Sequence, residues 1–363
     1  MAKTILATTT ITNNLISKAR FMKSAYRTTA TYRSIPAYLA AAALVAVCIA
    51  VIGPTRAFAC DPCGMHASVQ VPGLMNAMRT TGLQPGAWTV STQEQLSTFN
   101  TTGENDLRTT ESELELIRTL SVTQLSLGYN LSSQLAFQIN VPFIVRSYDH
   151  FERYRMVRDS ESGLGDVSLL STFSPYSFTD VDSRLFIAGM TGVKLPTGDT
   201  GSLQRIAQID NADAPTEIQG RGLTLGSGSV DVPLGVVAYG RHKNMVLFTS
   251  SQYTIRTEGA ADYRFANDLL WSLAPGWLFI IEEEKNLTIS AVVSGEHKGS
   301  DHIQGELLPR TASNNLYLGP ELFYSFSNRF SLQLAFDLPV ATDVGGATVK
   351  PETRSRASVS FSF

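Results

Sequence analysis

Charged residues are scarce in this sequence. Lys, Arg, Asp and Glu make up 17% of its 363 residues, against about 25% in ordinary soluble domains. Hydrophobic residues reach only 43%, so the chain is not a bundle of membrane helices either. The net charge of -3 gives no electrostatic reason to expect a nucleic-acid partner. Low charge without high hydrophobicity is typical of a β-barrel wall, in which apolar and small polar residues alternate.

Cysteine is also rare, and its few positions are informative. The chain has Cys48, Cys60 and Cys63. Cys48 lies in an apolar run that we expect to be removed, which leaves one Cys-x-x-Cys pair near the mature N-terminus. Such a pair in an exported chain favours a disulfide.

Only one apolar run is long enough to cross a membrane as a helix, and it spans residues 35–52. A basic segment without Asp or Glu precedes it, and Ala57-Phe58-Ala59 follows it. This pattern predicts a secretory signal peptide over residues 1–59. A permanent anchor and a lipoprotein signal with Cys60 first are the alternatives.

The rest of the chain shows a two-residue alternation. In 135–146, Leu, Phe, Ile and Val fall on one face, whereas Gln138, Asn140 and Arg146 fall on the other. Segments 329–341, 356–363 and 287–294 repeat the pattern. Successive side chains of a strand point to opposite faces, so each segment predicts a strand with one oily and one largely polar face.

Counting such segments predicts an all-β fold: a transmembrane antiparallel β-barrel of about twelve strands over residues 86–363. Residues 60–85 would form a short periplasmic extension. The predicted strands are 86–97, 116–128, 135–147, 163–175, 184–196, 227–240, 245–256, 264–278, 285–296, 315–326, 329–341 and 352–363.

The connections support the same fold, because long and short ones alternate as they do in outer-membrane barrels. The long ones are 98–115, 148–162, 197–226, 297–314 and 342–351; 257–263 is an exception, because it should be external yet is short. Loop 197–226 is long enough to fold inward and constrict a pore.

Several short motifs resemble a family of bacterial outer-membrane barrels described as phenol meta-pathway degradation proteins or as outer-membrane transporters. The motifs are Gly163-Leu164-Gly165-Asp166-Val167, Gly192-Val193-Lys194-Leu195-Pro196-Thr197-Gly198, Gly226-Ser227-Gly228-Ser229-Val230-Asp231 and Leu318-Gly319-Pro320-Glu321. The aromatic C-terminus also fits. The resemblance implies a barrel and the passage of small apolar or aromatic compounds, and it does not imply an enzyme.

Polar residues on the predicted inner faces are the candidate pore lining. They either set the selectivity of a permeation path or form a salt-bridged filling of the lumen. They are Gln138, Asn140, Arg146, Asp166, Lys194, Asp231, Glu321, Gln333, Asp337, Arg354 and Arg356.

The segment Cys60–His66 is the most unusual feature. Cys60, Cys63, Met65 and His66 could bind copper or zinc. The alternatives are a disulfide between Cys60 and Cys63 or thiol exchange. The haem signature is absent, because His66 does not directly follow Cys63.

No catalytic motif occurs, and His150, His242, His297 and His302 fall on predicted loops and turns. We therefore expect a non-enzymatic outer-membrane channel without a cofactor, in a Gram-negative bacterium. A metal-handling protein and a structural or adhesive barrel are the other hypotheses. The expected partners are outer-membrane lipids, a small-molecule solute and the barrel assembly machinery, which would engage the strand ending at Phe363.

Overall fold

The computed structural model describes residues 83–101, 116–152, 155–203, 222–282, 285–308, 311–343 and 349–363. The predicted signal and most of the predicted extension, with Cys60, Cys63, Met65 and His66, lie outside these residues. Within them, no helix has both the length and the apolar character needed to cross a membrane.

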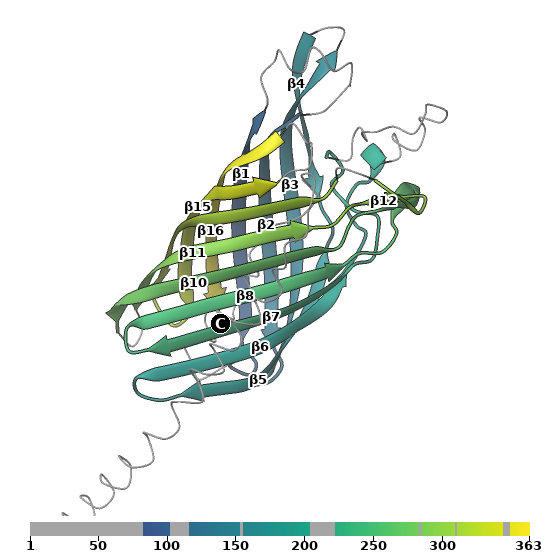
Figure 1. The fold of residues 1–363 in the computed structure, drawn as a ribbon. Helices are drawn as coiled ribbons and strands as arrows, with labels where there is room; N and C mark the ends of the chain where they lie inside the picture. The colour runs from purple at the N-terminus through teal and green to yellow at the C-terminus, as the bar shows by residue number, and fades with distance from the viewer. Residues whose placement is uncertain are drawn as a thin grey trace, which may run out of the picture. The chain divides into compact units, whose positions relative to one another are not determined.

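Antiparallel strands dominate the described residues (Figure 1). They are β1 (Trp88–Thr101), β2 (Leu116–Asn130), β3 (Leu135–Glu152), β4 (Arg155–Leu164), β5 (Ser168–Thr179), β6 (Ser183–Lys194), β7 (Val232–His242), β8 (Met245–Ile255), β9 (Tyr263–Arg264), β10 (Asp268–Ile281), β11 (Asn286–Lys298), β12 (His302–Ile303), β13 (Glu306–Leu307), β14 (Ser313–Ser325), β15 (Phe330–Asp343) and β16 (Val349–Ser362). A short 3-10 helix, Ala260–Asp262, precedes β9.

Thirteen of the described strands form one closed sheet. β1 pairs with β2 on one side and with β16 on the other, and Trp88 and Phe363 exchange backbone hydrogen bonds of 2.8 and 2.9 Å. β4 and β5 both pair with β3, β4 along 143–152 and β5 along 135–140. They share one place, so the thirteen strands occupy twelve places around the ring, which confirms the predicted barrel.

The alternation of the sequence becomes the two faces of the wall. On β3, Phe137, Ile139 and Phe143 are 44–46% exposed on the outer face. Gln138 and Asn140, between them, are buried on the inner face. An outer band of apolar side chains is what a lipid bilayer requires, so this is a barrel of the Gram-negative outer membrane.

Aromatic side chains gather at the end of the barrel where the short turns lie, as in the interfacial girdles of such barrels. Trp88 and Tyr129 have ring centroids 4.7 Å apart, and Tyr324 and Phe326 are 4.4 Å apart. This girdle fixes the level of one membrane surface on the wall.

The structure corrects the prediction that 148–162 is a loop. β3 continues to Glu152, and β4 returns beside it (Figure 1). The predicted strands 163–175, 227–240 and 264–278 also began too early, because β5, β7 and β10 start at Ser168, Val232 and Asp268. The residues before β5 and β7 instead form hydrogen bonds between side chains and backbone, which are described below.

Candidate functional site: the barrel interior

The predicted pore-lining residues line the inside of the barrel or its loop-bearing end, and most are buried. They fall into groups that the sequence did not reveal. Asp166, Lys194 and Asp231 meet where β5, β6 and β7 meet the long loop. Asp337, Glu321, Arg354 and Arg356 meet on β14, β15 and β16.

The first group is a clamp at the base of the loop between β6 and β7, made of Asp166, Lys194, Ser227, Asp231 and Arg256. Asp166 holds both ends of the loop. Its Oδ1 accepts from Gly198 N at 3.0 Å, and its Oδ2 accepts from Ser227 N at 2.8 Å. The three glycine-containing motifs at 163–167, 192–198 and 226–231 therefore meet at one carboxylate.

Lys194 joins the two acidic residues of the clamp. Its Nζ lies 2.9 Å from Oδ2 of Asp166 and 2.8 Å from Oδ2 of Asp231. Arg256 extends the chain of charges, because it contacts Asp231 at 3.4 Å and also pairs with Asp268. Buried charges are tolerated when they are paired and hydrogen-bonded, and both conditions hold here.

The clamp shifts the titration of Asp166, which lies in the connection before β5. Burial by itself would raise the pKa of this carboxyl, but the charge of Lys194 and the backbone N–H groups of Ser227 and Gly198 outweigh it. The pKa of Asp166 therefore lies below its ordinary value of 3.8.

Glycine is required where the two ends of the loop meet. A Cβ on Gly226 would stand 2.7 Å from Oδ1 of Asp166 and from Cα of Gly198. Both neighbours are held in place, since Asp166 is bonded on several sides and Gly198 contributes backbone. The glycines of these motifs thus allow the loop ends to approach the carboxylate.

The described end of this loop lies inside the barrel. Leu223 packs with Ile117 and Tyr148, and Leu225 packs with Leu120, Val122 and Ile144. The second set consists of inner-face residues of β2 and β3, so the segment Gly222–Gly226 runs along the inner wall. The prediction that the loop folds inward is confirmed for this segment.

Arg146 holds the inward segment against the wall. It lies on the inner face of β3 and is 1% exposed. Its Nη1 donates to the carbonyl oxygen of Gly222 at 2.8 Å and also to that of Thr224. One guanidinium nitrogen that donates to two alternate carbonyls of the segment fixes the path of its backbone.

The second group is a charged cluster of Glu296, Glu321, Asp337, Arg354 and Arg356. Nε of Arg354 lies 2.9 Å from Oδ2 of Asp337, and Nη1 of Arg354 binds Glu296. Nη2 of Arg356 lies 3.0 Å from Asp337 and 4.0 Å from Glu321. With all five ionised, three negative and two positive charges leave a formal charge of -1 in the cluster.

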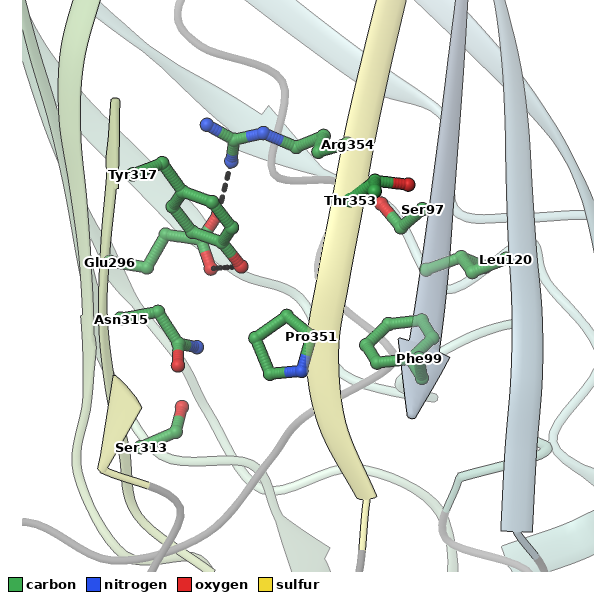
Figure 2. Close-up of a pocket in the computed structure, with 10 residues that line it drawn as sticks. All are labelled: Ser97, Phe99, Leu120, Glu296, Ser313, Asn315, Tyr317, Pro351, Thr353 and Arg354. Carbon is green, nitrogen blue, oxygen red and sulfur yellow. Dashed lines mark hydrogen bonds and ion pairs between the residues drawn. The ribbon is translucent and has the colours of Figure 1, made fainter. Parts of the chain in front are cut away.

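Arg354 also borders a small pocket on the inner face (Figure 2). Its Cζ lies 4.0 Å from the centre of the Tyr317 ring, a cation–π distance. Figure 2 shows Tyr317, Glu296, Asn315 and Ser313 on one side of this pocket, with Pro351, Phe99 and Leu120 facing them. The pocket therefore places apolar surface beside the charged cluster.

The remaining predicted residues also face inward. Gln138 donates to Asn140, and Nδ2 of Asn140 donates to Oγ of Ser168 at 3.1 Å. Gln333 is 7% exposed on the inner face of β15. These amides continue the polar side of the interior around the ring.

Sequence reasoning missed an apolar patch on the inner wall of β5 to β8. Its buried core is Phe186, Ala188, Met190 and Val237, with Leu170, Tyr239 and Phe248 packed against it. On β6, the outward residues Leu185 and Ile187 are also apolar. The loss of alternation on β6 is the signal that could have revealed the patch.

The histidines are not placed as predicted. His150, His242, His297 and His302 lie in β3, β7, β11 and β12, respectively. Asp301, between the last two, accepts from the Tyr263 hydroxyl and from Ala266 N, and pairs with Lys298. In the part of the chain that the structure describes, no group of three or more His, Cys, Asp or Glu side chains could hold a metal.

A solved structure supports the fold. An outer membrane channel from Pseudomonas putida F1 aligns with a TM-score of 0.52 and 15% identity, over 78% of this chain and 97% of that one. The toluene transporter TodX of Pseudomonas putida aligns over 85% of this chain and 99% of its own, at 10% identity and a TM-score of 0.36. No family model and no curated protein sequence matches the chain. The fold thus defines an outer-membrane β-barrel.

Proposed function

We propose that the chain is a passive outer-membrane channel for small molecules, with the segment Gly222–Gly226 as its constriction. The observation that carries this proposal is the position of that segment against the inner face of β2 and β3. A barrel of about twelve strands lies between those filled by side chains and those with a wide aqueous channel. An inward segment then sets how much of the lumen is open.

One side of the barrel interior is apolar and the opposite side is charged, and this contrast supports a particular class of solutes. β7 and β16 stand at the sixth and twelfth places of the ring, so they face each other across it. β7 carries Val237 of the apolar patch, whereas β16 carries Arg354 and Arg356. We propose that the solutes are small aromatic or apolar molecules that also bear a polar group. The apolar wall would contact the apolar part of such a solute, and the charged wall would contact its polar group. The aromatic or apolar part of this solute class is also what the family resemblance implies.

A variant that frees the constricting segment from the wall tests the proposed channel. We expect Arg146→Ala to raise single-channel conductance in planar bilayers and to enlarge the largest sugar that enters liposomes, because the segment loses its anchor. Arg158→Ala is the matched control, since that arginine lies on β4 and 67% of its side chain is exposed. If neither wild type nor Arg146→Ala conducts ions or admits any sugar, a structural or adhesive barrel replaces the channel.

The apolar patch tests the solute class. Phe186→Ser should slow the entry of an aromatic acid relative to a sugar of similar size, because only the former uses the apolar wall. The control is Phe336→Ser, which changes a phenylalanine on the outer face of β15. Equal slowing of both solutes would contradict the preference and leave the channel itself in place.

A further inference from the structure

The outer face of the barrel carries one acidic residue where lipid would be expected. Glu94 is the seventh of the fourteen residues of β1. Its neighbours Gln93 and Gln95 are buried on the inner face, whereas Leu96 on its own face is 43% exposed. The carboxylate therefore points outward at the middle of a membrane-spanning strand. On the other strands of the barrel, leaving out β4 with its Arg158, the described outward residues at mid-strand are uncharged.

Hydroxyl groups surround this carboxylate. Ser121 and Thr123, on the outer face of β2, each donate to one of its oxygens. Thr92 follows on the same face of β1, and Ser355 lies on the same face of β16, opposite Leu96. We call Thr92, Glu94, Ser121, Thr123 and Ser355 the polar strip.

The strip stands between two apolar parts of the outer face. Leu334, Phe336 and Leu338 of β15 border it on one side, and Phe143 and Val145 of β3 border it on the other, all of them exposed. Lipid tails offer no hydrogen bonds, so ionisable groups at this depth normally face protein or water. Small and hydroxyl-bearing residues are enriched where membrane segments pack together.

The strip contains both an acceptor and donors for hydrogen bonds to a second molecule. Glu94 has acceptor capacity beyond the two hydroxyls that it binds, because each carboxylate oxygen can accept more than one hydrogen bond. The hydroxyls of Thr92 and Ser355 make no hydrogen bond among the described residues. A two-fold axis passing between Glu94 and Ser355 would let each carboxylate accept from the Ser355 hydroxyl of the other copy. Two-fold contacts have this reciprocal form.

We propose that the polar strip is the interface through which two copies of this chain associate in the membrane. Glu94 of each copy accepts from Ser355 of the other, and the hydroxyls of β1 and β2 line the contact. This association is independent of the proposed channel activity.

The mass of the protein in lipid discs of bacterial outer-membrane lipid tests the interface. We expect wild type to form dimers, and Glu94→Leu and Ser355→Ala each to weaken the association about tenfold. The double variant should be no weaker than the more affected single variant, because both changes remove the same hydrogen bond. Ser251→Ala on the outer face of β8, diametrically opposite β1 in the ring, is the matched control.

Foldedness is checked separately by the heat-dependent shift in gel mobility. Leu suits hydrocarbon, so Glu94→Leu should remain a folded barrel. Thiol cross-linking locates the contact: with Cys60→Ser and Cys63→Ser, Thr92→Cys should link two copies and Ser251→Cys should not. Single copies of wild type in lipid discs, dimers unaffected by both single variants, or cross-links only to a protein of another mass would each overturn the proposal.

Discussion

Lys194 and Asp231 are joined by both backbone and side chain. Lys194 N donates to Asp231 O at 2.8 Å, Asp231 N donates back at 3.1 Å, and Nζ lies 2.8 Å from Oδ2. The pair closes the loop between β6 and β7 at its base, directly beside Asp166. The charges of the clamp thus serve loop placement as well as lining the interior.

Loss of the clamp lysine should destabilise the barrel. Lys194→Met leaves Asp166 and Asp231 buried without their shared cation, which costs about 3–5 kcal/mol for a buried pair. Urea unfolding in lipid vesicles, followed by tryptophan fluorescence, measures the loss. Lys350→Met, at an exposed position of β16, should change the unfolding free energy little. Equal stability of the two variants would contradict a paired role for Lys194.

Acid should weaken the same clamp. Folding lowers the pKa of Asp166 below 3.8, so its ionised form stabilises the fold at neutral pH. That contribution is lost as the pH falls below 3.8 through the folded-state pKa. Asp166→Asn should therefore be less stable at pH 7 and show a flatter decline of unfolding free energy in the acid range. Asp159→Asn on β4, which is exposed, should keep the wild-type slope.

Gly319 should not accept a side chain. A Cβ there would lie 1.8 Å from the backbone oxygen of Phe336, so β14 and β15 would have to separate. We expect Gly319→Ala to cost about 3 kcal/mol or more and to lower the folded yield. Gly189→Ala is the matched control, because its Cβ would meet nothing within 4 Å and would open into an outer hollow of about 430 Å³. Equal yields would contradict the steric argument.

The charged cluster should bias the ions that pass. Asp337 is shared by Arg354 and Arg356, so Asp337→Asn raises the formal charge of the cluster from -1 to 0. We expect the reversal potential in a salt gradient to move toward anion preference. Asp343→Asn, at the exposed outer end of β15, should leave it near the wild-type value. An unchanged potential in Asp337→Asn would indicate that the cluster only fills the barrel.

The sequence predicted the twelve strand places because alternation is a local property that each strand carries by itself. It also placed Asp337 and Arg354 inward for this reason. Their pairing depends on the register between β15 and β16, which alternation does not specify. The pairing is therefore a result of the closed sheet.

The clamp was harder to predict from the sequence. Asp166, Lys194 and Asp231 meet only because the loop ends fold back between neighbouring strands. Their motifs stood out through glycine spacing, yet spacing alone gave them no common partner. β4 was missed for a different reason. Its charged residues Asp159 and Glu161 made the sequence of this strand resemble that of a solvated loop.

The extension of β3 has a consequence for the cell surface. Beyond the residues that pair with β5, β3 stays paired with β2 up to Asp149 and with β4 up to Glu152, and the extension is braced at Asp149 by Arg118 and Arg158. A surface projection held by a ladder of backbone hydrogen bonds keeps its form when nothing is bound to it. The extension of β2, β3 and β4 is therefore a stiff edge of the barrel, whose form does not depend on a binding partner.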